Sequence, residues 1–186
     1  MPLVDRDDSV LIVVDAQEGF FGESDEARGT LARLTWLARV ASKFGVPAVL
    51  TEEEPGRNGP VEAPLTELFP DSPPLVKPTF GLTGTPEIVD RIDATGRGTA
   101  VMVGFETDVC VAQSAIGLRQ RGLRVVVVED AVWSPGEMHD RGLRRMAAEG
   151  VELNHCKGLA YEWARTVDLA RSALHAPEVG EPPFPL

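Results

Sequence analysis

The sequence predicts an α/β fold, a three-layer α/β/α architecture with a six-stranded, mostly parallel and doubly wound sheet. Two observations carry this prediction. Short runs of β-branched residues alternate along the chain with segments of helical periodicity, which is the pattern of a parallel sheet covered by helices on both faces. The chain of 186 residues is also long enough for one well-packed core and short for two.

Six segments have the composition of buried strands. The first, Val10-Leu-Ile-Val-Val14, is apolar without interruption, which is typical of a strand buried on both faces. The following predicted strands are residues 46–50, 75–77, 99–103, 123–128 and 151–153.

Helical segments separate these strands. Residues 30–44 carry apolar side chains at helical spacing, and Gly45 is a typical helix end. Ser134 followed by Glu137, with Pro135 between them, is a capping-box pattern that predicts a helix from residue 135. The predicted helices are residues 30–44, 85–94, 108–121, 135–149 and 159–174.

Two segments lack such a pattern. Residues 51–74 are rich in Pro, Gly and Glu and are expected to form a long loop with one helical turn near residues 63–68. Residues 176–186 contain four prolines and are expected to be an extended tail, loose or lying on a partner. We therefore assign residues 1–175 to one α/β domain and 176–186 to a Pro-rich tail.

Composition and charge disfavour several classes of binding partner. A formal net charge of -11 argues against a nucleic-acid partner and gives no support for docking on an anionic membrane. Two cysteines make no disulfide framework, and the first nine residues lack the pattern of a signal peptide. We expect a cytoplasmic protein that acts on a small-molecule substrate.

Three reactive side chains fall at predicted strand ends. Asp15 follows the first strand, Lys77 ends the third, and Cys110 follows the fourth. Ligands in such sheets bind at the carboxyl ends of the strands. With Thr107 as N-cap, Cys110 occupies the third helical position, where the helix dipole and a nearby Lys77 ammonium favour thiolate. Asp15 then exchanges protons during acyl transfer.

Each residue alone has a simpler explanation. A single cysteine is usually a small buried hydrophobe, a strand-terminal aspartate is often a turn residue, and a loop lysine is usually solvated. Their joint placement at three strand ends favours a site.

At these residues the chain resembles the isochorismatase-like cysteine hydrolases, which include nicotinamidases and carbamoylsarcosine amidases. The resemblance runs from about residue 9 to residue 165. The matching segments are Val13-Val-Asp15-Ala-Gln17 with Phe20-Phe21, Lys77-Pro-Thr-Phe80, Gly104-Phe-Glu-Thr-Asp-Val-Cys-Val111, Glu129-Asp-Ala131 and the region of His139.

The resemblance implies a six-stranded parallel sheet and a catalytic triad of Asp15, Lys77 and Cys110. It also implies a cis peptide bond between Phe105 and Glu106, and an oxyanion hole made by the backbone amides of Glu106 and Cys110. The implied reaction is attack of Cys110 on a carbonyl carbon, release of ammonia or an amine, and hydrolysis of the acyl-enzyme. A homodimer or larger homo-oligomer is expected as well.

The chain departs from the nicotinamidases at the metal site. In place of their Asp-x-His motif it has Thr51-Glu-Glu-Glu54, and no histidine precedes His139. Imidazole is the expected ligand for zinc or iron. We therefore expect no metal and no cofactor, and interpret residues 52–54 as a solvated acidic loop.

A second departure is Glu106, because smaller or apolar residues are commoner there in the family. A carboxylate near the thiolate raises the cysteine pKa. Glu106 either points away, pairs with an arginine such as Arg57, or selects a cationic substrate. The candidate substrate-binding residues are Gln17, Phe20, Phe21, Phe80 and Trp133.

The sequence thus predicts a metal-independent cysteine hydrolase that cleaves a C–N bond of a small amide, imide or carbamoyl compound. Two alternatives stay open: isochorismatase-type hydrolysis of an enol ether, and a non-catalytic thiol-sensing or binding member of the fold. A flavodoxin-like nucleotide binder is disfavoured, because no Gly-rich phosphate loop follows the first strand.

Overall fold

A six-stranded parallel sheet forms the centre of the computed structural model, which describes residues 2–185. The strand order is β3-β2-β1-β4-β5-β6, and each neighbouring pair is parallel, as expected for a doubly wound sheet. The strands are β1 (Ser9–Val14), β2 (Ala48–Glu52), β3 (Leu75–Val76), β4 (Thr99–Phe105), β5 (Arg124–Trp133) and β6 (Glu152–Asn154).

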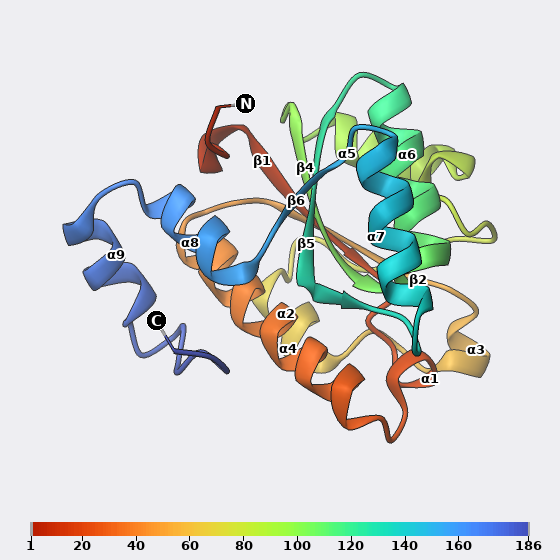
Figure 1. The fold of residues 1–186 in the computed structure, drawn as a ribbon, viewed down its shortest axis with the longest axis horizontal. Helices are drawn as coiled ribbons and strands as arrows, with labels where there is room; N and C mark the ends of the chain where they lie inside the picture. The colour runs from red at the N-terminus through yellow and green to blue at the C-terminus, as the bar shows by residue number, and fades with distance from the viewer. Residues whose placement is uncertain (1, 186) are drawn as a thin grey trace.

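Helices cover both faces of this sheet, which gives the predicted three layers (Figure 1). One layer holds α2 (Asp25–Lys43), α4 (Ala63–Leu68), α8 (Cys156–Ala164) and α9 (Val167–Leu174). The other holds α5 (Pro86–Asp93), α6 (Ala112–Gln120) and α7 (Met138–Ala148). Short helices α1 (Glu18–Phe21) and α3 (Pro55–Asn58) follow β1 and β2, and single turns form at Arg6–Asp8, Leu82–Gly84 and Thr107–Val111.

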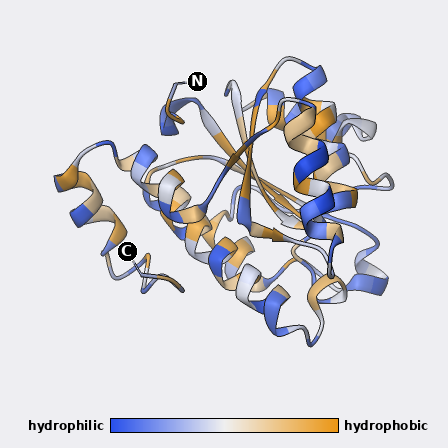
Figure 2. Ribbon diagram, in the orientation of Figure 1, coloured by the Kyte–Doolittle hydropathy of each residue, from blue (hydrophilic) through white to orange (hydrophobic). Residues whose placement is uncertain are grey.

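The two cores explain why the first strand is apolar throughout. Leu11 and Val13 face the layer of α2 and α8, whereas Val10, Ile12 and Val14 face the layer of α5 and α6. All five side chains have zero exposure. Figure 2 shows the same arrangement as hydrophobic strands in the centre and hydrophilic outer faces on the helices.

Strands β2, β4, β5 and β6 end later than predicted, β1 ends as predicted, and β3 ends one residue earlier, at Val76. β2 continues to Glu52 rather than ending at Leu50, because Thr51 and Glu52 pair in parallel with Leu75 and Val76 of β3. β5 continues to Trp133 beyond a register shift against β4.

The predicted capping box at Ser134 is wrong. Helix α7 begins at Met138, and Gly136 takes a left-handed backbone conformation with φ +56° before it. Ser134 Oγ instead donates to Asp108 Oδ1 at 2.6 Å, so this hydroxyl links the start of the Cys110 turn to the segment before α7.

The last predicted helix is two helices. Arg165 has φ +62° and ends α8, and Thr166 caps α9 by accepting a hydrogen bond from the Leu169 amide at 3.2 Å. At the other end of the chain, α2 starts at Asp25, five residues earlier than predicted, because Ser24 caps it.

The Pro-rich tail packs on the chain itself rather than lying loose. Val179 is fully buried, and the Phe184 ring meets Trp36 of α2 edge-on with 5.0 Å between centroids. Glu178 forms an ion pair with Lys43 of the same helix. Within residues 2–185, no helix has the length and apolar character needed to cross a bilayer.

Candidate active site

Three neighbouring strands each deliver a charged residue to one edge of the sheet. Asp15 follows β1, Glu53 follows β2 and Lys77 follows β3, and these strands are adjacent in the sheet. Parallel pairing continues past the strand ends, since the Asp15 amide donates to Thr51 O and the Lys77 amide donates to Glu52 O. The three side chains therefore start from one row at the carboxyl edge.

Asp15 and Lys77 form a fully buried ion pair. Lys77 Nζ lies 2.7 Å from Asp15 Oδ2, and both side chains have zero exposure. Thr51 Oγ1 donates to the other oxygen, Oδ1, at 2.9 Å. Oδ2 accepts no hydrogen bond of regular geometry from residues 2–185, so it keeps capacity to accept a proton.

Cys110 lies beside this pair. Its Sγ is 3.5 Å from Lys77 Nζ, and the residue is 2% exposed. Sγ and the Asp15 carboxylate are within 4.8 Å of one another. The structure thus brings the three predicted catalytic residues together from positions far apart in the sequence.

The helix start at Cys110 differs by one residue from the prediction. A π-helical turn, Thr107–Val111, precedes α6, and its N-cap is Glu106 rather than Thr107. Cys110 is therefore the fourth residue of this turn. His139 supports it from α7, with Nδ1 3.0 Å from Thr107 Oγ1, and burial lowers the pKa of this imidazole.

Glu53 is a member of this cluster that the sequence interpretation missed. Its Oε2 lies 3.0 Å from Lys77 Nζ and accepts a hydrogen bond from Cys110 Sγ at 3.3 Å. The side chain is only 19% exposed, so residues 52–54 are not a uniformly solvated acidic loop. Glu52 accepts from the Val61 amide, and Glu54 alone is exposed. The missed signal was the two-residue extension of β2, which makes Glu53 a strand-end residue like Asp15.

Electrostatics keep the resting sulfur protonated. Burial raises the pKa of the Cys110 thiol, and the charges of Asp15 and Glu53 raise it further, whereas Lys77 lowers it. Lys77 thus acts in the predicted direction, but thiolate is not favoured in the resting site, because desolvation and two carboxylates outweigh one ammonium.

The pKa values of Asp15 and Lys77, the two members of the ion pair, are both raised, which suits proton exchange. Burial raises the pKa of Asp15, and the Lys77 charge offsets this only in part. For Lys77, burial acts to lower the pKa, but the Asp15 charge and hydrogen bonds outweigh it, so its pKa is raised and the amine stays protonated. A carboxylate with a raised pKa is a stronger base than an ordinary one.

The turn before Cys110 has the geometry that the resemblance implied. The Phe105–Glu106 peptide bond is cis. Burial raises the pKa of the Glu106 carboxyl, with further contributions from Asp108 and Glu53. Arg57 pairs with Glu54 at 3.6 Å, so Arg57 is not the partner of Glu106.

Gln17, a predicted substrate-binding residue, contacts the backbone of Glu53 and holds it in place. Its side chain is fully buried, Oε1 accepts from the Glu53 amide at 2.7 Å, and Nε2 donates to Glu53 O at 3.1 Å and to Gly59 O. Asn58 Nδ2 adds a third hydrogen bond, to Glu53 O at 2.9 Å. The side chains of Gln17 and Asn58 therefore hold the loop after β2 in place.

The four aromatic residues predicted to bind substrate lie in different surroundings. Phe80 is 54% exposed and lines a pocket of about 530 Å³ together with Glu53 and Lys77. Phe21 is buried against the Phe105 ring, with 5.8 Å between centroids, and Phe20 packs on the same core. Trp133 borders a different hollow of about 380 Å³, which His139 also lines.

A metal at this cluster would compete with Lys77. Asp15, Glu53 and Cys110 offer ligand atoms within 4.8 Å of one another, the one such group of His, Cys, Asp and Glu found among residues 2–185. Lys77 Nζ already lies 2.7, 3.0 and 3.5 Å from these atoms. A cation bound to all three would have to displace the ammonium, so the donor set does not fit a metal while Lys77 is charged and in place.

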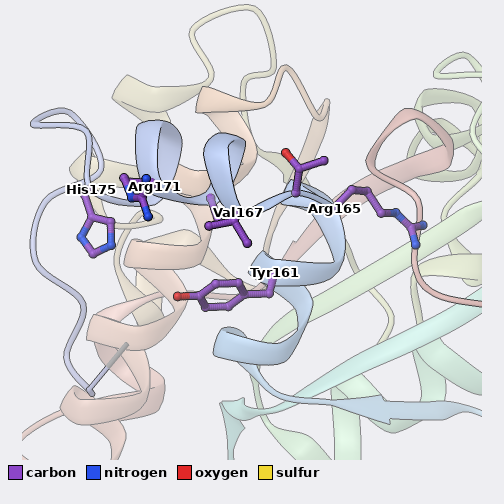
Figure 3. A pocket seen from close by; sticks show the side chains of 7 residues that line it. Tyr161, Arg165, Val167, Arg171 and His175 are labelled. Carbon is purple, nitrogen blue, oxygen red and sulfur yellow. The ribbon is translucent and has the colours of Figure 1, made fainter.

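Another surface hollow, of about 430 Å³, lies at the far end of the molecule between α8 and α9. Figure 3 shows Tyr161 facing Val167 there, with Arg171 and His175 to one side. None of the cluster residues lines it. The pocket beside Glu53 and Lys77 is therefore the one associated with the candidate chemistry.

Comparison with known proteins agrees with the geometry. A family profile described as the isochorismatase domain matches residues 9–155. The probable hydrolase YcaC of Escherichia coli (strain K12) is 30% identical over 170 residues, which cover 87% of this chain and 80% of that protein. Isochorismatase domain-containing protein 2 of Bos taurus is 32% identical over 158 residues, covering 83% and 74%.

Comparison with solved structures again identifies YcaC proteins as relatives. YcaC from Pseudomonas aeruginosa, with hexane-2,5-diol and covalent acrylamide, superposes with a TM-score of 0.84 at 28% identity and covers 95% of this chain and 93% of its own. Escherichia coli YcaC, described as an octameric hydrolase of unknown specificity, gives 0.86 at 26%, covering 96% and 93%. Nicotinamidase PncA from Bacillus subtilis gives 0.72 at 16%, covering 80% and 99%, a likeness of fold alone.

Proposed function

The chain belongs to the isochorismatase-like hydrolase family, and from that premise we propose that it is a cysteine hydrolase that cleaves a C–N bond of a small amide, imide or carbamoyl compound without a metal. One observation carries the proposal. A buried Asp15–Lys77 ion pair lies within reach of the Cys110 sulfur at the carboxyl edge of the sheet. A nucleophile beside a base that is itself held by a third group is the arrangement that covalent catalysis requires.

In the first half of the reaction, Cys110 Sγ bonds to the carbonyl carbon while its proton passes to the Asp15 carboxylate. The carbonyl oxygen becomes an oxyanion, which the backbone amides of Glu106 and Cys110 stabilise. Collapse of this intermediate breaks the C–N bond, and the nitrogen leaves with the proton from Asp15. The product is an acyl-enzyme on Cys110.

In the second half, water adds to the thioester and gives a proton to Asp15. Collapse then releases the acid and returns the proton to the sulfur. Lys77 remains protonated throughout and holds Asp15 in position, which agrees with its raised pKa. The raised pKa of Asp15 favours both proton transfers, because it lies closer to neutral pH than that of an ordinary carboxyl.

The relatives support a homo-oligomer as part of the proposal. Escherichia coli YcaC is described as octameric, and this chain covers 93% of that structure's length. Light scattering on the purified protein should give a mass that is a multiple of the 20.1 kDa chain. A mass of one chain at micromolar concentration would contradict this part.

The test of the chemistry is a screen of small amides, ureas and carbamates with intact mass spectrometry of the protein. We expect turnover of one or more compounds and a transient acyl mass on Cys110, both abolished by Cys110→Ala and retained by Cys156→Ala. Cys156 is a suitable control because it is fully buried in the core beneath α2. Absence of any turnover would count against a hydrolase of C–N bonds, and activity that survives Cys110→Ala would favour enol-ether hydrolysis.

A further inference from the structure

Glu53 stands between the nucleophile and the pocket. Its Oε2 contacts both Cys110 Sγ, at 3.3 Å, and Lys77 Nζ, at 3.0 Å. Its side chain is 19% exposed, whereas those of Asp15 and Lys77 have no exposure. Glu53 also lines the pocket of about 530 Å³. A molecule that approaches the sulfur from this pocket therefore meets the Glu53 carboxylate first.

The position of this carboxylate is fixed by buried polar contacts. The Gln17 amide binds both the N–H and the C=O of Glu53, and Gln17 has zero exposure. Asn58 binds the same carbonyl. A surface side chain that contacted Lys77 by chance would not need such hydrogen bonds to its backbone. The loop after β2 therefore holds Glu53 beside the Cys110 sulfur as part of the architecture of the site.

The charge balance around the sulfur is negative. Asp15 and Glu53 contribute two carboxylates against the single ammonium of Lys77, which is already shared between them. Glu106 adds a third carboxyl close enough to Glu53 that the two interact electrostatically. Such a site attracts a cation near the sulfur and repels an anion.

We propose that Glu53 is a specificity-determining residue that directs this site to substrates carrying a protonated nitrogen, an ammonium, amidinium or guanidinium group, near the scissile carbonyl, and against carboxylates. This inference rests on the proposed function for the identity of the reacting bond. The charge preference itself is a property of the Cys110 surroundings and can be measured without any substrate.

The probes are two methanethiosulfonate reagents of similar size, one with a trimethylammonium group and one with a sulfonate. Each reacts with a thiol by the same step: the sulfur bonds to the thiosulfonate sulfur, methanesulfinate leaves with the electron pair, and the thiol proton goes to solvent. Rates at Cys110 are followed by intact mass spectrometry and peptide mapping. Taking the cation-to-anion rate ratio within each variant cancels differences in thiol reactivity between variants, and dividing it by the ratio for free cysteine cancels the difference in intrinsic reactivity of the two reagents.

We expect the normalised ratio to exceed one in the wild type and to fall by about tenfold in Glu53→Gln, since one charge a few ångströms from the reagent is removed. Glu67→Gln is the matched control, because it removes one charge from an exposed position on α4 outside the pocket, and it should leave the ratio within about twofold of wild type. A wild-type ratio near one, or a ratio unchanged by Glu53→Gln, overturns the proposal.

The two experiments distinguish a failure of the charge preference from a failure of the proposed hydrolase activity. A ratio that behaves as expected, together with no turnover in the amide screen, would refute the proposed function and leave the charge selectivity standing. Turnover of neutral or anionic amides with a ratio near one would do the reverse. Should Glu53→Gln not fold, the wild-type ratio alone still decides whether a cation preference exists.

Discussion

Lys77 Nζ lies 2.7 Å from Asp15 Oδ2, and neither side chain is exposed to solvent. The pair joins the ends of β3 and β1 across β2, so it fixes the relation of two strands that are not direct neighbours. Because Lys77 also contacts Glu53 and Cys110, one ammonium touches every acidic group of the cluster. Stability and reactivity at this edge therefore depend on the same side chain.

Replacing Lys77 by methionine should lower the free energy of unfolding by about 3 kcal/mol, because a buried carboxylate loses its partner. Urea denaturation at pH 7 measures the change. The control is Arg121→Met, which breaks an exposed pair with Asp93 and should cost less than about 1 kcal/mol. Equal losses of unfolding free energy in the two variants would show that the buried pair contributes no more to stability than the exposed pair. Adding Asp15→Asn to Lys77→Met should restore part of the loss.

The pH dependence of Cys110 alkylation should reveal its raised pKa. Thiolate is the reacting form, and burial together with Asp15 and Glu53 raises the pKa above the ordinary 9.0. The rate with iodoacetamide should therefore be below that of free cysteine at pH 7 and keep rising with pH beyond 9. Glu53→Gln should move the profile to lower pH, and Lys77→Ala should move it to higher pH.

Peptide mapping separates the two cysteines in this experiment. Cys156 is fully buried, and its pKa is raised by burial as well, so it should label more slowly than Cys110 at every pH. Equal labelling of both, or a Glu53→Gln profile identical to wild type, would contradict the electrostatics of the cluster.

Much of the fold could be predicted because the strands are locally distinctive. An uninterrupted apolar run such as Val10–Val14 has few alternatives to a strand buried on both faces. Reactive residues directly after such runs identify Asp15, Lys77 and Cys110, because parallel strands end at one edge. The residues of the predicted triad could thus be found together without any knowledge of loop geometry.

Glu53 could not be found in this way because its place depends on pairing between strands. The run of glutamates from Glu52 is unfavourable for a strand by composition, and only the pairing of Thr51 and Glu52 with Leu75 and Val76 extends β2 to the cluster. The raised pKa of Cys110 could not be predicted for a different reason. Burial is its largest cause and the charge of Asp15 comes next, ahead of the opposing effect of Lys77, whereas Glu53 makes a smaller contribution.

Gly104→Ala should prevent normal folding. Gly104 is the penultimate residue of β4 and has φ +121°, and a Cβ added there would lie 1.9 Å from the backbone oxygen of Val14. We expect a loss of at least about 4 kcal/mol, because strand β1 would have to shift. Gly122→Ala is the control: φ is +98° but nothing lies within 4 Å of the added Cβ, so the cost should be about 1–2 kcal/mol of backbone strain. Thermal unfolding of the two variants compares them, and similar melting temperatures would refute the steric argument.

Gln17→Ala should release Glu53 without touching any charge. The substitution removes three hydrogen bonds to the loop after β2, and the Glu53 amide loses its acceptor while the Glu53 carbonyl keeps its bond from Asn58, at a cost of about 1–3 kcal/mol. Hydrogen exchange should speed up at the amides of residues 53–59. The matched variant Asn58→Ala removes one hydrogen bond to the same carbonyl and should have a smaller effect.

The reactivity of Cys110 provides the second measurement on Gln17→Ala. If Gln17 acts by positioning Glu53, this variant should lower the normalised cation-to-anion ratio toward that of Glu53→Gln, although every carboxylate is still present. Faster exchange with an unchanged ratio would mean that Lys77 alone keeps Glu53 at the sulfur. In that case Gln17 would serve only the stability of the loop, and the charge selectivity would depend on the Lys77–Glu53 contact.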